Sequence, residues 1–258
     1  MVTPAIARQS SRLGRIAALI YGLICYATFF VTFLYAIGFV GNLLVPKTID
    51  AAPTLPFYTA LTINVALLGV FGLQHSVMAR PAFKRAWTRI VPQAVERSTY
   101  VLFSSLCLIA LFAGWQPLGI TIWDVQNPFG QAILYLLYAL GWLLVLVSTF
   151  LINHFDLFGL RQVYLNLIGQ EYTSLKFATP GLYKVVRHPL YVGWFLAFWA
   201  TPTMTATHLV FALVTTAYIL VAIQLEERDL ITAHGEDYVT YRRRVPMLIP
   251  FAKRRAIR

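Results

Sequence analysis

The chain has 258 residues, of which 59% are hydrophobic and 12% charged, and its formal net charge is +11. So apolar a composition excludes an ordinary soluble domain and indicates an integral membrane protein. The positive charge does not indicate nucleic-acid binding, because its uneven distribution between loops, described below, explains it better. Both cysteines, Cys25 and Cys107, lie within apolar runs, so no disulfide framework is predicted.

Four apolar segments follow one another in the first 152 residues. Residues 1–15 carry three arginines and lead into an apolar run over 16–44. This run is far longer than the core of a signal peptide, so a retained first transmembrane helix is predicted. Proline-containing or basic connections separate the later segments. The three further spans are predicted at residues 57–79, 98–114 and 131–152, with connections at 46–56, 80–97 and 116–130.

The last hundred residues alternate between mixed and apolar composition. Residues 163–188 are too charged to cross a bilayer and are predicted to lie along its interface. The apolar stretch 190–224 is interrupted by Thr201-Pro202-Thr203. One helix over it would measure about 52 Å against a hydrocarbon core of about 30 Å, so we predict a helical hairpin with two short, tilted arms. The chain then turns polar at Glu226 and is predicted to turn at Gly235.

The pattern therefore predicts an all-α integral membrane protein with about six transmembrane helices, the last two forming the hairpin. Six spans place both termini on one side of the membrane. Of the 21 lysines and arginines, all but Lys47 fall on that side, which the positive-inside rule assigns to the cytoplasm. A bacterial inner membrane is the expected location. The basic runs at 242–244 and 253–255 are predicted to contact anionic lipid headgroups.

Polar and ionisable side chains gather at the cytoplasmic ends of these spans. Such groups are costly at membrane depth and mark a functional site by default. The cluster comprises Gln74-His75, Asn153-His154, Asp156, Arg161, Arg187-His188 and Glu226-Glu227. Asp124 and His208 fall on the other side and are assigned to loops. The five histidines show no metal-ligand spacing, so no metal site is predicted.

A compound motif occupies the C-terminal part. It consists of RHPLYVGW (187–194), the hairpin, Glu226-Glu227 and a G-x-x-Y-x-x-Y-x-x-x-V-P pattern over 235–246. This motif resembles the C-terminal half of the isoprenylcysteine carboxyl methyltransferase and phospholipid methyltransferase superfamily. The upstream strings FGLQHSVMARP (71–81) and INHFDLFGLRQ (152–162) resemble instead its NnrU-like branch. That branch includes membrane enzymes that methylate methanethiol to dimethyl sulfide.

The resemblance implies a pocket for S-adenosylmethionine between the Arg187-His188-Pro189 loop, the last two spans and a C-terminal helix. Carried over residue by residue, the cofactor lining would be Tyr183, Arg187, His188, Tyr191, Gly193, Glu226 and Glu227. A helix that starts at Pro189 offers free N–H groups to a carboxylate, and a glutamate accepts hydrogen bonds from a ribose or an ammonium group. Residues 1–162 would form a four-span bundle that supplies the substrate site. Residues 163–258 would form the methyltransferase-type half.

Methylation of a small thiol, which converts the cofactor to S-adenosylhomocysteine, needs a deprotonated sulfur in line with the methyl group. A free thiol titrates at about 8.5, so a base or a positive environment would help. His75 and His154 are the candidate bases, and the sequence does not choose between them. Asp156 is expected to orient one imidazole, and Arg161 either to pair with Asp156 or to favour the thiolate. Capping and interfacial networks are the structural alternatives for these residues.

Other functions fit the same scaffold. Sterol-reductase-like membrane enzymes share a related C-terminal half and bind NADPH, so the scaffold alone does not prove methyl transfer. A non-catalytic NnrU-like membrane protein is a second alternative. Within the methyltransferases, a prenylated cysteine or a phospholipid stays open as the substrate.

Overall fold

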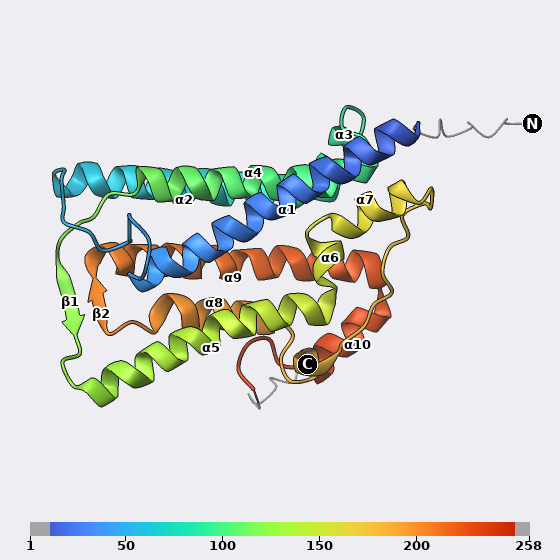
Figure 1. The fold of residues 1–258 in the computed structure, drawn as a ribbon. Helices are drawn as coiled ribbons and strands as arrows, with labels where there is room; N and C mark the ends of the chain where they lie inside the picture. The colour runs from blue at the N-terminus through green and yellow to red at the C-terminus, as the bar shows by residue number, and fades with distance from the viewer. Residues whose placement is uncertain (1–10, 251–258) are drawn as a thin grey trace, which may run out of the picture.

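The computed structural model describes residues 11–250, most of which are helical. The long helices run side by side in one bundle, which the first helix crosses obliquely (Figure 1). Five of them are long and apolar enough to cross a membrane: α1 (Arg12–Gly41), α2 (Phe57–Ala79), α4 (Gln93–Gly114), α5 (Pro128–Ile152) and α9 (Ala206–His234). The predicted class, an all-α integral membrane protein, is confirmed.

The first four predicted spans correspond to helices α1, α2, α4 and α5. Helix α2 has the predicted bounds because Pro56 precedes it and Pro81 begins the next helix. Helices α1 and α4 begin earlier than predicted, at Arg12 and Gln93, since their first turns carry polar and charged side chains that an apolar pattern leaves out. Helix α5 also begins three residues earlier than predicted, at Pro128, so hydropathy places these helices correctly but shortens three of them.

The predicted hairpin is present, with arms of unequal length. Its first arm, α8 (Pro189–Trp199), has 11 residues and measures about 16 Å, roughly half of a hydrocarbon core. Its second arm, α9, has 29 residues and measures about 44 Å. The expectation of two short arms is therefore wrong for α9. No glycine or proline interrupts the chain between Ala206 and Gly235, so the helix continues through Glu226 and Glu227.

One end of the bundle, which we call the ribbon end, carries a short antiparallel pair of strands (Figure 1). Strand β1 (Thr121–Asp124) lies in the connection predicted as a loop, and it pairs with β2 (Thr203–Thr205) in the turn of the hairpin. Asp124 is exposed there, whereas His208 lies buried in the first turn of α9. The assignment of His208 to a loop is therefore wrong.

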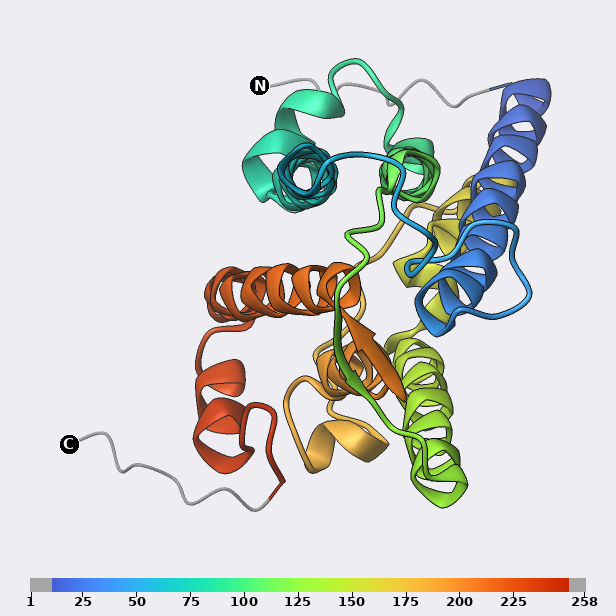
Figure 2. The ribbon, with the colours of Figure 1, turned by 90° about the vertical axis from the view of Figure 1, so that its left-hand side faces the viewer.

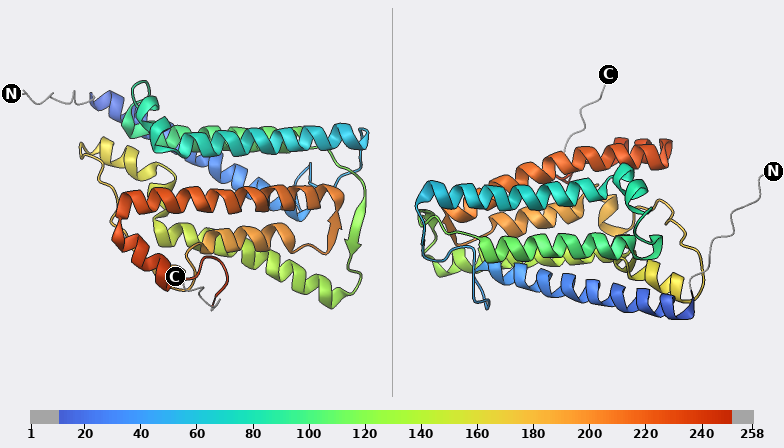
Figure 3. Two further views of the ribbon diagram at one scale, coloured as in Figure 1. Left: turned by 180° about the vertical axis from the view of Figure 1, so that it is seen from behind. Right: turned by 90° about the horizontal axis from the view of Figure 1, so that it is seen from above.

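The opposite end, which we call the RHP end, holds the short helices and the start of α1 (Figure 3). These are α3 (Pro81–Trp87), α6 (His154–Leu157), α7 (Leu160–Leu167), the 3-10 helix η1 (Gly181–Lys184) and α10 (Glu236–Arg244). Residues 168–180 connect α7 to η1 without regular structure and are mostly exposed. The basic run 242–244 forms the last turn of α10, while the run 253–255 lies outside the described residues.

Seen along the helices, the C-terminal hairpin of α8 and α9 lies between α5 on one side and the pair α2 and α4 on the other (Figure 2). Helix α5 packs along α8, α9 contacts both α8 and α2, and α2 packs on α4. The N-terminal bundle and the hairpin thus meet at two places, where α5 packs along α8 and where α2 faces α9. These contacts bring distant parts of the sequence to one site.

Helices α5 and α8 touch through their backbones. A Cβ added at Gly193 would lie 2.7 Å from the carbonyl oxygen of Gly141, and one added at Gly141 would lie 2.6 Å from the backbone nitrogen of Ala197. Small residues allow such approach in membrane helix pairs. The close neighbour of Gly193 in the structure is therefore helix α5, and its place in the cofactor lining stays a prediction.

Gly193→Ala is expected to lower the melting temperature of the purified protein, because the new methyl group must push α5 and α8 apart. Overpacking of this kind costs about 1–3 kcal/mol. Gly69→Ala on α2 is the matched control, since a Cβ there meets no atom within 4 Å. Equal melting temperatures for the two variants would contradict this packing role.

Candidate functional site

A buried ion-pair network forms the centre of the RHP end. Arg187 Nε donates a hydrogen bond to Glu227 Oε1 at 2.7 Å, and His188 Nε2 lies 3.0 Å from the same oxygen. Only 7% of the Glu227 side chain is exposed. Arg187 Nη1 also donates to the carbonyl oxygens of Arg242 and Val245, at the end of α10. Arg187 and Glu227 therefore join α9 to the start of α8 and to the C-terminal segment.

The glycine-tyrosine pattern of the sequence folds back onto the Arg187-His188-Pro189 loop. Gly235 separates α9 from α10 with φ of +57°, a conformation that favours glycine. The backbone N–H groups of Arg187 and His188 then donate to the carbonyl oxygens of Pro246 and Met247. These bonds hold residues 183–188 against residues 241–247.

A tyrosine hydroxyl strengthens the same contact. Tyr241 donates from its hydroxyl group to the carbonyl oxygen of Tyr183 at 2.7 Å. Burial raises the pKa of Tyr183 and raises the pKa of Tyr241 to about 12. Both phenols therefore stay neutral at physiological pH, and that of Tyr241 acts as a hydrogen-bond donor.

The two adjacent glutamates face different surroundings, as their separation of about 100° around the helix predicts. Glu227 points into the ion-pair network, whereas 43% of the Glu226 side chain is exposed. Tyr191 donates from its hydroxyl group to Glu226 Oε2 at 2.9 Å, and His188 Nδ1 lies 3.9 Å from the same oxygen. Glu226 is thus the carboxylate of the pair that stays accessible to a ligand.

A hollow of about 260 Å³ adjoins this network on the side of α10. Its rim combines aromatic, hydroxyl and charged side chains, namely Phe177, Thr179, Lys184, Asp237, Thr240, Tyr241, Arg244 and Val245. Phe177 comes from the irregular segment 168–180 and packs against the rings of Tyr238 and Tyr241. This segment therefore forms one wall of the hollow.

His75 lies on α2 with two hydroxyl groups around it. Its Nδ1 is 3.1 Å from Ser104 Oγ, and the Tyr100 hydroxyl is 3.0 Å from its Nε2. Sequence reasoning missed both of these partners, although Tyr100 and Ser104 are four residues apart on one face of α4. Because the Tyr100 and Ser104 hydroxyl groups lie within hydrogen-bonding distance of the His75 ring, these side chains can pass a proton between them.

Contacts between α2 and α9 place His75 near the level of Tyr218, on the ribbon-end side of Glu226. The Ser76 and Tyr218 hydroxyl groups are 3.1 Å apart, and Arg80 pairs with Asp229 at 2.9 Å. Tyr218 and Asp229 lie on either side of Glu226 along α9.

Tyrosines also link the two groups across the helix interface. The phenols of Tyr100 and Tyr218 are close enough to Tyr191 to interact with it electrostatically. The His75 group and the Tyr191–Glu226 pair therefore face each other across the contact between α2 and α9.

His154 lies on another side of the bundle. Helix α5 ends at Asn153, whose φ of +143° redirects the chain, and His154 begins α6. Its Nε2 is 2.8 Å from the Tyr26 hydroxyl of α1, and its Nδ1 is 2.8 Å from Thr149 Oγ1. Burial lowers the pKa of His154, which keeps the imidazole neutral. The histidine joins α1 to α5.

Asp156 and Arg161 form an ion pair at the surface of the RHP end. Arg161 Nη1 donates to Asp156 Oδ1 at 2.9 Å and to the carbonyl oxygen of Thr173 at 2.8 Å. The Tyr172 hydroxyl donates to Asp156 Oδ2. The predicted pairing of Arg161 with Asp156 is confirmed. The predicted orientation of an imidazole by Asp156 is wrong, because these contacts tie the carboxylate to α7 and to the segment 168–180.

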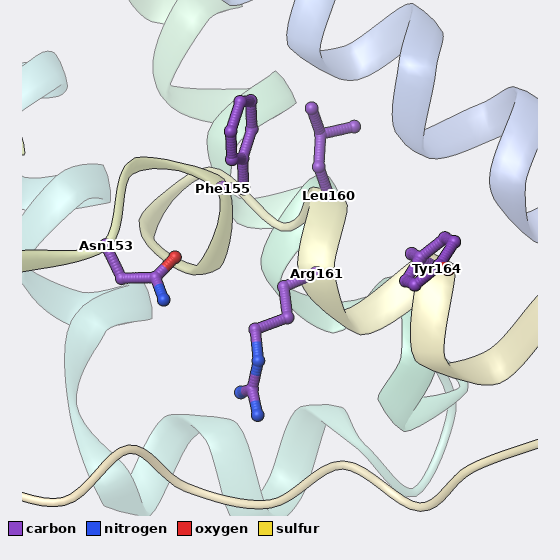
Figure 4. A pocket seen from close by; sticks show the side chains of 5 residues that line it. All are labelled: Asn153, Phe155, Leu160, Arg161 and Tyr164. Carbon is purple, nitrogen blue, oxygen red and sulfur yellow. The ribbon is translucent and has the colours of Figure 1, made fainter. Parts of the chain in front are cut away.

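Arg161 also borders an open, mostly apolar hollow of about 400 Å³ (Figure 4). Asn153, Phe155, Leu160 and Tyr164 complete its lining. Phe155 and Tyr164 are exposed, so this hollow opens to the surface of α6 and α7. The predicted polar cluster is therefore divided: His75 lies with the Arg187–Glu227 network, and His154, Asp156 and Arg161 lie apart from it. Within residues 11–250 no group of three or more ligating side chains is arranged for a metal ion.

Known proteins resemble the chain along most of its length. It is 63% identical to a methanethiol S-methyltransferase of Crocosphaera subtropica, over 94% of this chain and 95% of that protein. It is 54% identical to a methanethiol S-methyltransferase of Mycobacterium tuberculosis, over 93% and 98%. It is 32% identical to nurim of Xenopus laevis, over 70% and 66%. The family described as phospholipid methyltransferase matches residues 131–236, and no solved structure matches the chain.

Proposed function

The chain belongs to the family of the methanethiol S-methyltransferases, and from this premise we propose that it transfers a methyl group from S-adenosylmethionine to methanethiol, forming dimethyl sulfide. The observation that carries the proposal is the similarity to these enzymes over nearly the whole of both chains. Membership of the family makes the protein a methyltransferase, which sets aside the NADPH-dependent reductase and the non-catalytic protein. A prenylated cysteine or a phospholipid is the remaining alternative substrate, and the full-length relatives favour the small thiol.

The residues at the RHP end fit a methyl donor with a carboxylate, an ammonium group and a ribose. Glu226 has an accessible carboxylate to accept hydrogen bonds from the ribose or the ammonium group, and Tyr191 orients it. The first turn of α8 offers N–H groups to the donor's carboxylate. Tyr183 and His188 complete the proposed lining. Arg187 and Glu227 are assigned a positioning role, because their charged groups are already paired with each other.

His75 is the proposed general base. S-Adenosylmethionine supplies an electrophilic methyl group on a sulfonium. As the methanethiol sulfur forms its bond to that methyl group, the bond from the methyl group to the sulfonium breaks, S-adenosylhomocysteine leaves, and the thiol proton passes to the imidazole. His75 is preferred to His154 because its partner Tyr100 lies within electrostatic reach of Tyr191, which donates a hydrogen bond to Glu226. Tyr100 and Ser104 would orient the imidazole.

We further propose a bacterial inner-membrane protein with its RHP end in the cytoplasm. All lysines and arginines except Lys47 lie in segments that would face that side. The arginines of residues 242–244 would contact anionic headgroups. The methyltransferase-type half is proposed to include α5, since the family match begins at residue 131 and α5 packs along α8.

The test is to incubate detergent-purified protein with S-adenosylmethionine and methanethiol in a sealed vial and to measure dimethyl sulfide in the headspace by gas chromatography. Product that depends on both substrates is the expected result. Absence of product, with heat of binding for S-adenosylmethionine in a calorimeter, would keep the methyltransferase and reject the small thiol.

Glu226→Gln is expected to raise the KM for S-adenosylmethionine roughly 10- to 100-fold, because a hydrogen bond to a charged acceptor is lost. The same headspace assay measures this effect. Glu171→Gln, an exposed glutamate in the segment 168–180, is the charge-matched control. A KM equal to that of the control would remove Glu226 from the donor site.

A further inference from the structure

A buried acid and a buried histidine meet at the ribbon end, far from the proposed active site. Asp50 comes from the connection between α1 and α2, and His208 from the first turn of α9. Their side chains are 8% and 1% exposed. His208 Nδ1 lies 3.5 Å from Asp50 Oδ2. Ionisable groups that are buried to this extent need partners of opposite charge, and these two side chains are close enough to form an ion pair.

The positions of the protons on His208 follow from its neighbours. His208 Nε2 lies 2.9 Å from the carbonyl oxygen of Phe198, which only accepts hydrogen bonds, so Nε2 carries a proton. Nδ1 has no hydrogen-bond partner among the described residues, and the nearest charged group to it is the carboxylate, at 3.5 Å. Without a proton, Nδ1 would direct its lone pair at an anion. With one, the ring is an imidazolium that donates from both nitrogens.

Asp50 is held in its ionised form. Asn42 Nδ2 donates to Asp50 Oδ2 at 2.8 Å, and the Thr205 hydroxyl donates to Oδ1. Burial alone would raise the pKa of Asp50, but the nearby His208 and the hydrogen bonds from Thr205 and Asn42 outweigh it and lower the pKa. The carboxylate is therefore an anion at neutral pH and calls for a positive partner.

Other charges on the surrounding elements are occupied elsewhere. Lys47, in the same connection as Asp50, donates to the carbonyl oxygen of Ala113. Asp124, on β1, accepts a hydrogen bond from Thr203. His208 is thus the cationic partner that the described residues offer to Asp50.

The pair fastens the turn of the hairpin. Thr205 caps α9 by accepting from the His208 N–H group and also donates to Asp50, while the His208 ring bonds to Phe198 at the end of α8. The arms joined by this turn carry Tyr191 and Glu226 nearer the RHP end. A change at the turn alters how α8 and α9 lie against each other.

We propose that Asp50 and His208 form a buried carboxylate–imidazolium pair that fastens the α8–α9 turn, and that alkaline pH releases it by removing the proton from His208 Nδ1. The pair is intact while Asp50 is ionised and His208 is charged. Its contribution to stability is therefore lost at alkaline pH, when the proton on Nδ1 is removed. The proposal does not depend on the identity of the substrate.

The first experiment measures the protonation of His208 directly in the wild-type protein. His208 is the only histidine preceded by a threonine, so labelling threonine carbonyls with 13C and histidine with 15N identifies its signals by NMR. Two protonated ring nitrogens at pH 7, and one at strongly alkaline pH, are expected. A bare Nδ1 at pH 7 would overturn the proposal.

The second experiment follows the melting temperature of the detergent-purified protein from pH 6 to pH 10. Asp50→Asn keeps the shape of the side chain, and its amide can donate to a neutral Nδ1. At pH 6 to 7 it is expected to melt about 5 °C below the wild type. The difference should shrink as the pH rises, because only the wild type loses an ion pair. A difference that does not change with pH would also contradict the proposal.

Discussion

Replacing His75 by alanine is expected to lower kcat roughly 100- to 10,000-fold, the usual contribution of a positioned general base. The thiol would then have to lose its proton to water before it attacks. Binding of S-adenosylmethionine should be unchanged, because His75 contacts Ser104 and Tyr100 of α4 and none of the residues proposed to hold the donor.

The measurement separates turnover from binding. Initial rates of dimethyl sulfide formation give kcat, and calorimetry with S-adenosylmethionine gives the affinity. His154→Ala is the comparison, since its partners Tyr26 and Thr149 lie toward α1 and its kcat should stay close to that of the wild type. A slow His154 variant beside a fast His75 variant would reverse the assignment of the base.

Glu227→Gln is expected to be the most destabilising of these substitutions. Breaking a buried ion pair leaves an uncompensated charge, here Arg187, and costs about 3–5 kcal/mol. The segment after Gly235 should detach from the Arg187-His188-Pro189 loop, so donor binding should be lost as well. Thermal unfolding and limited proteolysis at residues 236–250 measure the two effects.

An exposed ion pair provides the control for this variant. Asp229 pairs with Arg80, and both side chains are about one-third exposed or more. Asp229→Asn should therefore cost only about 0–1 kcal/mol. The double variant Arg187→Met/Glu227→Met should recover part of the lost stability, because it buries no lone charge. A Glu227→Gln protein as stable as the Asp229→Asn protein would refute the network's role.

The sequence predicts the bundle well because hydropathy indicates which segments cross the membrane and prolines indicate where a helix begins or ends. Residues 57–79 have the predicted bounds for this reason. The compound motif was also informative: the structure brings Arg187 and His188 to Glu227, forty residues away in the chain. The family resemblance is confirmed by the relatives.

The sequence did not predict the contacts that depend on which neighbouring helix packs against a given helix face. Hydropathy gives the depth of a residue but not its direction around the helix. His75 and His154 were therefore predicted in one cluster, although the partners of His75 lie on α4 and His154 contacts Tyr26 of α1. A glycine in the sequence indicates that another group approaches the backbone closely, but it does not identify that group. At Gly193 the approaching group is helix α5. His208 was assigned to a loop because it falls on the side opposite the polar cluster, but it lies in the first turn of α9, which Thr205 caps.

The backbone bonds from Arg187 and His188 to Pro246 and Met247 also set an order of events during biosynthesis. Every transmembrane helix of the described chain is synthesised before residues 241–247, yet the Arg187-His188-Pro189 loop is closed only by them. A nascent chain can therefore insert its whole bundle while its donor site is still open. Competence to bind the methyl donor would arrive as a final step, after membrane insertion is complete.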